Sequence, residues 1–193
     1  MAGRPIEVKL NTEVRDIAAL GADEVIVATG STANRIPIPG IEKGIQAIDF
    51  LLGKKEVGEN VTIIGGGLTG CEIAYELYLQ GKKPTIVEMK EDLIAITGVC
   101  LANSSYLRDF FKANKVPVHL ETAVCEIQDD GVLVKDRNGM NYKIAADSVI
   151  LSTGYKRNPL AEKTAHIHLV GDCDSVGNLR TVIWKAWDVA MRL

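Results

Sequence analysis

The sequence lacks a long hydrophobic run, an excess of basic residues and a leader of charged then apolar residues. Its formal net charge is −3, and only 5% of its residues are aromatic. A membrane-spanning helix needs about 20 apolar residues in a row, and nucleic-acid binding favours a basic surface. The sequence therefore predicts no membrane segment and no nucleic-acid partner.

The sequence also lacks closely spaced cysteines, because no C-x-x-C motif occurs in the chain. This spacing argues against a redox dithiol and against a paired-cysteine metal site. We expect buried, reduced thiols in a cytoplasmic protein. His166 and His168 alternate on a predicted strand without a matching carboxylate or thiol motif, so we predict no metal site. The four cysteines are Cys71, Cys100, Cys125 and Cys173.

A glycine-rich segment is the most informative feature of this 193-residue chain. Residues 61–70 read VTIIGGGLTG, in which Gly65, Gly67 and Gly70 have the G-x-G-x-x-G spacing. The motif follows an apolar strand pattern and opens a helical pattern. In a dinucleotide-binding loop the first glycine makes the turn, the second lets the backbone approach the pyrophosphate, and the third lets the helix pack tightly. The amides of Gly67, Leu68 and Thr69 are predicted to meet the phosphates. The predicted cofactor-binding residues of this loop are Gly65, Gly66, Gly67, Leu68, Thr69 and Gly70.

An acidic residue ends the next strand, as this kind of site requires. Glu88 closes the apolar run 84–88 and lies 18 positions after Gly70. A carboxylate there accepts hydrogen bonds from the adenosine ribose and repels a 2′-phosphate, which favours NAD(H) over NADP(H) by about tenfold or more. The positive charge of Lys90 reduces this preference, because a nearby cation can partly accept a 2′-phosphate. Met89 and Lys90 are included in the predicted cofactor-binding site. FAD also fits a carboxylate at this position, so the local sequence leaves both cofactors open.

The remaining patterns predict a Rossmann-like α/β chain. Residues 122–147 form three alternating segments separated by Asp-Gly and Asn-Gly turns, which is typical of an antiparallel meander. Residues 31–40 contain two prolines and predict a linker. Strands are predicted at 6–14, 23–30, 61–64, 84–88, 116–120 and 147–154, with another in 166–174; helices are predicted at 47–55, 68–83, 101–115 and 179–193.

An internal similarity suggests two domains of one design. DEVIVATG at 23–30 and DSVILSTG at 147–154 share D-x-V-I-x-x-T-G at an offset of 124 residues. Each occurs where a strand would return to a Rossmann sheet. Only the second domain then has its glycine fingerprint within the chain.

Several motifs together resemble the two-dinucleotide flavoproteins that include thioredoxin reductase and the pyridine nucleotide-disulfide reductases. These motifs are VIVATGS with IPIPG, then IIGGGLTGCE, VILSTGYKRNP and HLVGDC. In that family an FAD domain is interrupted by an inserted NAD(P) domain. The resemblance implies a three-layer ββα NAD(H)-binding domain at 45–155, flanked by FAD-domain remnants: the tail of the first segment at 1–44 and the returning segment at 156–193.

The sequences of three segments are most similar to the C-terminal part of 2-enoate and 2,4-dienoyl-CoA reductases. These segments are GGGLTGCEIAYEL, GVCLANSSYLRDFF and LRTVIWKAWDVA. Such NADH:flavin oxidoreductases join an old-yellow-enzyme-type barrel and an iron–sulfur cluster to this module. Thioredoxin reductase itself is disfavoured, since its NAD domain carries a C-x-x-C motif.

The resemblance also implies roles for single residues. Glu72 and Gly154 match positions beside the nicotinamide half of NADH. Gly171 and Asp172 match a Gly-Asp motif whose carboxylate contacts FAD, and Gly30 would lie near that flavin. No second G-x-G-x-x-G occurs in the chain, so we expect FAD in the full-length parent but not in this fragment, which would not turn over alone.

Three functions follow from the sequence. The leading hypothesis is an NADH-docking fragment of a flavin-dependent oxidoreductase that reduces activated C=C bonds, with the remaining FAD segment and the barrel as its partners. A second is a non-catalytic NAD-binding sensor or interaction module. A third is FAD binding by the same fingerprint. The protein itself need supply no catalytic acid, base or nucleophile for the hydride step.

Overall fold

The computed structural model describes residues 6–95 and 100–193, which form two compact units. Unit 2 is the continuous segment Ala33–Gly154, and unit 1 combines Met1–Thr32 with Tyr155–Leu193. The chain thus passes between the units twice. Each unit is described by itself.

A parallel sheet forms the middle layer of unit 2. Among the described residues its strand order is β3-β10-β4-β5-β6, with every neighbouring pair parallel. Successive side chains along a strand point to opposite faces, so each strand contributes to two cores. The strands are β3 (Ile45–Gln46), β4 (Asn60–Ile64), β5 (Lys83–Val87), β6 (Val118–His119) and β10 (Ser148–Leu151).

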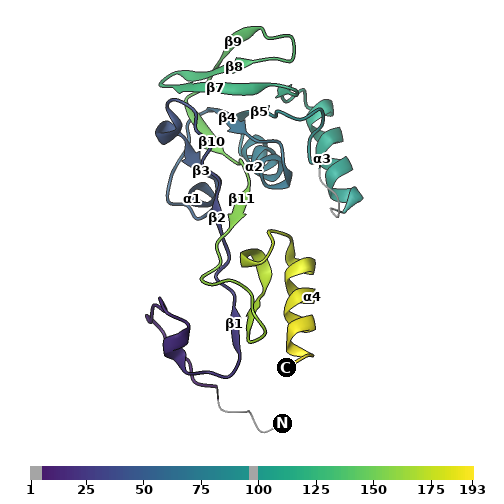
Figure 1. Cartoon of the computed structure of the whole chain (residues 1–193). Coiled ribbons are helices and arrows are strands. Elements are labelled where there is room, and N and C mark those ends of the chain that lie inside the picture. Colours follow the sequence, from purple (N-terminus) through teal and green to yellow (C-terminus); the bar gives the residue numbers. More distant parts are fainter. Residues whose placement is uncertain (1–5, 96–99) are drawn as a thin grey trace. The chain divides into compact units, whose positions relative to one another are not determined.

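Helices cover one face of this sheet (Figure 1). Val61 and Ile63 of β4 pack in a core with Ile73 and Leu77 of α2 and Phe111 of α3. Gly81, one residue past the C-cap of α2, has a φ of 80° and closes the helix end. The helices are α1 (Ala47–Leu51), α2 (Leu68–Leu79) and α3 (Leu101–Ala113), with a 3₁₀ turn at Ile41–Lys43.

The meander covers the other face and completes three layers (Figure 1). Ile64 and Val87 on the sheet pack with Ile127, Val132 and Val134 of the meander. Both strand pairs are antiparallel, with a register shift between Val124 and Glu126. The strands are β7 (Ala123–Gln128), β8 (Gly131–Lys135) and β9 (Asn141–Ala145). The predicted Rossmann-like ββα architecture is confirmed.

Unit 1 has a much smaller core. β1 (Val25–Val27) pairs in parallel with β12 (Ile167–Leu169), and Val27, Leu169 and Cys173 form its buried cluster. A 3₁₀ turn at Gly171–Cys173 precedes α4 (Leu179–Ala190), which begins with a capping box between Asn178 and Thr181. A second 3₁₀ turn spans Ala18–Leu20. β2 (Ser31–Ala33) and β11 (Tyr155–Arg157) form a further two-stranded sheet where the chain passes between the units.

Two sequence expectations prove wrong. Residues 6–14 form no strand and are almost entirely exposed, because no described strand pairs with them. Trp184 and Trp187 are 65% and 63% exposed on α4. Cys71 and Cys173 are buried as expected, but Cys100 is exposed, since it lies at the N-cap of α3.

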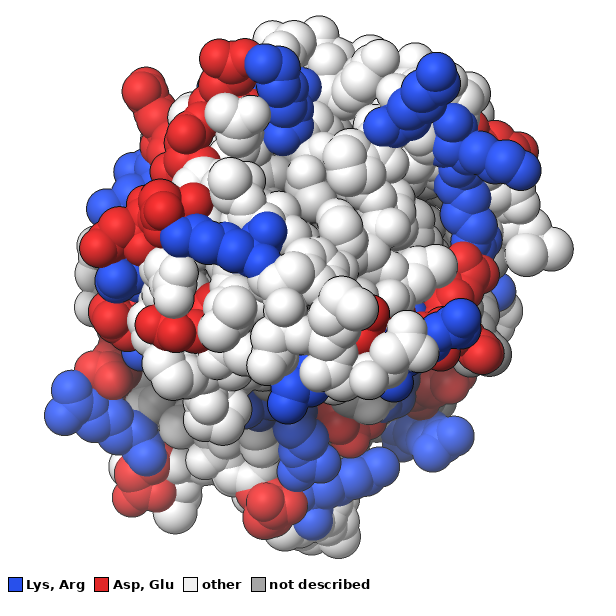
Figure 2. Space-filling model, turned by 90° about the horizontal axis from the view of Figure 1, so that it is seen from above, with Lys and Arg blue, Asp and Glu red and all other residues white. Residues whose placement is uncertain are grey.

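Charged side chains of both signs are interspersed on the face seen in Figure 2. They surround a broad area without charged residues. This mixed pattern agrees with the small net charge of the sequence.

Candidate functional site

The glycine turn joins β4 to α2, as the fingerprint predicts. Gly65 has a φ of 108°, and its N–H donates to Val87 O at 2.9 Å. A Cβ at Gly65 would lie 2.2 Å from Ser152 O, and one at Gly70 would lie 2.0 Å from Gly65 O. Both positions therefore require glycine, one for the turn and one for the close packing of α2 on it.

Gly67 differs from its neighbours because nothing lies within 4 Å of the place where its Cβ would be. Its φ of −69° is accessible to any residue, so the fold itself does not demand glycine there. Gly67 is the N-cap of α2, and no side chain caps this helix end. The open space and the uncapped amides fit a group that approaches the backbone from outside.

Glu88 directly follows β5 and contacts the glycine turn. Its Oε2 accepts a hydrogen bond from Gly66 N at 2.6 Å, and its Oε1 accepts one from Lys90 N at 2.8 Å. A carboxylate has about four acceptor positions, so each oxygen keeps capacity for a ribose hydroxyl. Sequence reasoning assigned Glu88 to the ribose alone and missed its bond to the turn.

Met89 and Lys90 extend the site outward. The Met89 side chain is 73% exposed, and Lys90 Nζ lies 3.4 Å from Ala95 O. A largely apolar cavity of about 250 Å³ opens at the carboxyl ends of β4 and β5 and is lined by Gly65, Glu88 and Met89 among others. Ligands of open parallel sheets bind at this end of the strands.

The two residues expected near the nicotinamide also lie in unit 2. Glu72 is exposed on α2. Gly154 has a φ of 82°, and its carbonyl accepts a hydrogen bond from Asn34 N at 2.9 Å. Asn34 and Thr153 are bonded reciprocally, since each side chain contacts the other's carbonyl at 3.2 and 3.0 Å. Asn34 carries no sequence motif, so only the fold identifies it.

Unit 1 brings its own predicted residues together. Ser31 Oγ donates to Asp172 Oδ2 at 3.0 Å, and Gly177 N donates to Asp172 Oδ1 at 3.1 Å. Gly30 immediately precedes Ser31 and has a φ of 72°, while Gly171 has a φ of 67°. The Thr-Gly strand end and the Gly-Asp motif thus meet, although 141 residues separate Ser31 from Asp172.

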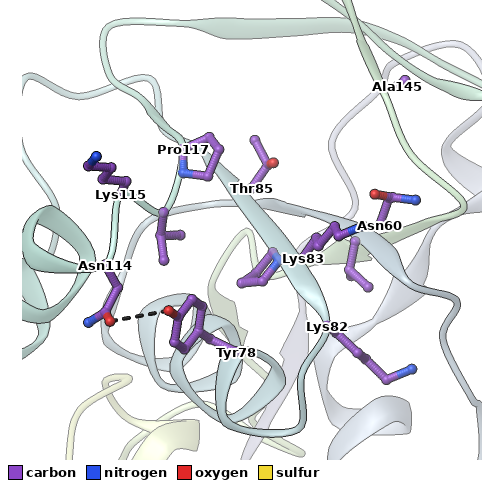
Figure 3. A pocket seen from close by; sticks show the side chains of 12 residues that line it. Asn60, Tyr78, Lys82, Lys83, Thr85, Asn114, Lys115, Pro117 and Ala145 are labelled. Atoms are coloured by element: carbon purple, nitrogen blue, oxygen red, sulfur yellow. Dashed lines mark hydrogen bonds between the residues drawn. The ribbon is translucent and has the colours of Figure 1, made fainter.

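A larger pocket of about 380 Å³ lies at the opposite, amino ends of β4 and β5 (Figure 3). Several of its polar groups are already bonded within the protein. Lys82 Nζ donates to two carbonyls at 2.9 Å, Lys83 pairs with Glu59, and Tyr78 donates to Asn114. This pocket therefore offers a weaker case for a ligand than the glycine turn.

The histidines of unit 1 pair with one carboxylate. Glu24 accepts from His166 at 3.0 Å and from His168 at 2.7 Å, across the ends of β1 and β12. Within residues 6–95 and 100–193, no group of three or more His, Cys, Asp or Glu side chains has a metal-binding arrangement.

Comparison with known proteins identifies the family. The model of the pyridine nucleotide-disulphide oxidoreductases matches residues 4–190. The chain belongs to this family. Cinnamate reductase of Clostridium sporogenes is 40% identical over 200 residues, which cover 97% of the chain and 29% of that protein. NADH oxidase of Thermoanaerobacter brockii is 33% identical over 204 residues, covering 100% of the chain and 31% of that protein.

The comparison with solved structures agrees with the sequence comparison. A complex of 2-naphthoyl-CoA reductase with 2-naphthoyl-CoA superposes with a TM-score of 0.83 at 27% identity, covering 97% of the chain and 30% of the reductase. The resemblance to enoate-reductase-type oxidoreductases is thereby confirmed. The chain spans less than a third of the length of these relatives.

The helices of the described residues are too short or too polar to cross a membrane. This finding is consistent with the absence of a long apolar run in the sequence.

Proposed function

We propose that unit 2 binds NADH and holds it for hydride transfer to FAD in a longer flavin-dependent oxidoreductase. The observation that carries this proposal is the open backbone at Gly67, between a glycine turn at Gly65 and the packed helix start at Gly70. Family membership and the similarity to an NADH oxidase support it.

The backbone amides at the start of α2 are the groups that would receive the pyrophosphate. Hydrogen bonds to a charged group contribute about 1.5–3 kcal/mol each. The helix dipole adds only about 0.3–1 kcal/mol. The amides of Gly67, Leu68 and Thr69 therefore contribute more to binding than the dipole does, and their fixed directions decide the orientation of the ligand.

Glu88 would select NADH over NADPH. Its carboxylate lies next to the turn and keeps free lone pairs for the ribose hydroxyls. A 2′-phosphate in the same place would meet like charge without a compensating hydrogen bond. We expect a preference of about tenfold or more, with Lys90 reducing it.

Orientation is the contribution of this chain to the reaction. When bound, NADH supplies a hydride from its nicotinamide ring. The fingerprint turn and Glu88 fix the adenosine and pyrophosphate, and Glu72 and Gly154 lie in unit 2 as candidates for the nicotinamide half. Holding a reactant in place replaces a bimolecular encounter by a local one.

Unit 1 is proposed to complete an FAD site with residues outside this chain. Asp172, bonded to Ser31 and Gly177, is the candidate flavin contact, with Gly30 and Gly171 close by in sequence. The pyrophosphate of FAD needs a glycine fingerprint of its own, and the only one in this sequence belongs to unit 2. We therefore propose that this chain alone does not retain FAD.

The longer enzyme is proposed to reduce an activated C=C bond. The similar proteins include a cinnamate reductase and a 2-naphthoyl-CoA reductase, whose names specify an enoate and an aromatic thioester. The organic substrate would contact residues outside this chain. An old-yellow-enzyme-type barrel is the proposed partner.

Parallel calorimetric titrations with NADH, NADPH and FAD test the proposal. We expect NADH to bind at least about tenfold more tightly than NADPH, and FAD not to bind. Equal affinities for NADH and NADPH would remove the role given to Glu88. FAD that stays with the chain through gel filtration would mean that the fingerprint holds the flavin instead.

A further inference from the structure

The peptide between Gly66 and Gly67 decides where the Gly67 amide points. A peptide unit is planar and trans, so its C=O and N–H point in opposite directions. Gly66 O accepts hydrogen bonds from Ile94 N at 2.7 Å and from Cys71 Sγ at 3.4 Å. The Gly67 N–H therefore points away from Ile94 and Cys71. Among the described residues it has no acceptor of its own.

Gly66 is held from its other side by Glu88. Gly66 N donates to Glu88 Oε2 at 2.6 Å, and Gly66 is buried. A Cβ there would lie 2.5 Å from Leu93 Cδ2 and 3.0 Å from Glu88 Cβ. The segment after β5 thus folds back over the turn and encloses Gly66 between Glu88, Leu93 and Ile94.

Ile94 makes its bond in an unfavourable conformation. Its φ is 51°, a left-handed value that is rare for a β-branched residue. Such a backbone persists only where its surroundings impose it. Leu93 and Ile94 are 4% and 3% exposed and belong to the core under α2 and α3. Burial fixes the side chains, but it does not by itself fix the direction of the carbonyl before Ile94.

Arg108 of α3 fixes that carbonyl. One guanidinium nitrogen donates to Leu93 O, and the same nitrogen lies 3.0 Å from Asp92 Oδ2. Nε donates to Asp92 Oδ1 at 3.1 Å. Asp92 Oδ1 also accepts from Leu93 N at 2.8 Å. Arg108 and Asp92 thereby hold both polar backbone groups of Leu93, the residue before Ile94.

We infer that Arg108 is a positioning residue of the nucleotide site, holding Ile94 N–H on Gly66 O so that Gly67 N–H faces the dinucleotide. This inference rests on the proposed function for the identity of the ligand. Without Arg108, Ile94 relaxes toward negative φ and its N–H leaves Gly66 O. The Gly66–Gly67 peptide can then rotate, and the phosphate loses a preset donor.

Arg108→Gln tests the inference through amide exchange and binding. We expect the Ile94 amide, followed by NMR in the ligand-free protein, to exchange at least about tenfold faster. We expect the NADH dissociation constant from calorimetry to rise about tenfold. Arg108→Lys, which can still donate to Leu93 O or Asp92, should recover part of both effects. Asp92→Asn serves as a second variant if Arg108→Gln does not fold.

Arg137→Gln is the matched control. Arg137 pairs with Glu121 at 3.0 Å in the same unit but makes no bond to the 92–94 segment. It should change neither Ile94 exchange nor NADH affinity. Unchanged Ile94 exchange in Arg108→Gln would overturn the inference, as would faster exchange with unchanged affinity. Absence of NADH binding in the wild type would instead contradict the proposed function, because Ile94 exchange still reports whether Arg108 holds the turn.

Discussion

Glycine occupies the three fingerprint positions for different physical reasons. Gly65 needs a positive φ, and Gly70 needs the absence of a Cβ 2.0 Å from Gly65 O. Gly67 meets neither constraint, because its backbone conformation is ordinary and its surroundings are open. The fold therefore does not require glycine at position 67, which agrees with the proposed approach of a dinucleotide there.

Gly67→Ala should separate binding from stability. A methyl group would stand where the pyrophosphate approaches, so we expect NADH affinity to fall at least about tenfold. Alanine is a poorer N-cap than glycine but lowers the entropy of the unfolded chain, so the free energy of unfolding should change by less than about 1 kcal/mol. Calorimetry and chemical denaturation measure the two quantities.

Gly81→Ala is the control for this prediction. Gly81 is equally open but has a φ of 80°. It should lose about 1 kcal/mol of stability and keep its NADH affinity, since it lies at the other end of α2. Loss of stability without loss of affinity in Gly67→Ala would contradict the role given to Gly67.

Within the elements, β4 carries an unusual buried hydroxyl. Thr62 is 1% exposed, and its Oγ1 has no hydrogen-bond partner among the described residues. We expect Thr62→Val to raise the free energy of unfolding by about 1 kcal/mol, because it removes an unsatisfied polar group from the sheet. Urea denaturation measures the change.

Thr122→Val supplies the contrast. Thr122 is 2% exposed, but its Oγ1 donates to Leu120 O at 2.8 Å. Its removal should lower stability, because it leaves that carbonyl with one bond fewer. If Thr62→Val proved equally destabilising, the Thr62 hydroxyl would have a partner after all.

The pairing of β1 with β12 should depend on pH. Hydrogen bonds from His166 and then His168 lower the pKa of Glu24 below its ordinary value of 4.5. A carboxyl with a depressed folded pKa contributes stability above its unfolded pKa and loses it as pH falls through the folded value. The advantage of the wild type over Glu24→Gln should therefore be present above about pH 4.5 and disappear at lower pH.

Tryptophan fluorescence can follow this effect, because Trp184 and Trp187 both belong to unit 1. Thermal unfolding between pH 3 and 6 would be recorded for both proteins. In a variant carrying His166→Asn and His168→Asn, Glu24→Gln should have no pH-dependent effect. A constant difference across this range in the histidine-containing protein would contradict the prediction.

At the scale of the whole chain, the two larger hydrophobic cores lie entirely within unit 2. Their buried and partly buried members all fall in one chain segment between Ile36 and Leu151. The core of unit 1 has only Val27, Leu169 and Cys173 as buried members. Most of the stabilising burial is thus independent of unit 1.

A fragment of residues 33–154 should consequently fold and bind NADH. Its affinity should lie within about twofold of the whole chain, because the glycine turn, Glu88 and the 92–94 segment are all inside it. Circular dichroism and calorimetry would check the fold and the binding. A fragment that folds but no longer binds NADH would show that unit 1 contributes to the site.

Much of unit 2 could be predicted from the sequence. The alternating segments gave the meander, the apolar runs gave β4 and β5, and the glycine spacing located the turn between β4 and α2. The bond from Gly66 to Glu88 and the placement of Ile94 could not be predicted. They depend on how the segment after β5 folds back, and no local pattern encodes that path.

Prediction from the sequence was less accurate in unit 1. The alternation in residues 6–14 predicts a strand, yet a strand forms only where a partner strand lies beside it. The helix α4 is apolar on one face, but nothing among the described residues covers its Trp184 or Trp187. Periodicity reports which face is apolar and does not report what packs against it.

By itself, then, the sequence determined the main strands and helices of unit 2 along the chain and the position of the fingerprint, because these follow from local spacing and from glycine's freedom at positive φ. Only the tertiary structure decided which peptide of that turn faces outward and which side chains hold it there. Arg108 of α3 contacts Leu93, and the neighbouring Ile94 contacts Gly66. Such contacts between distant segments are a property of the folded chain.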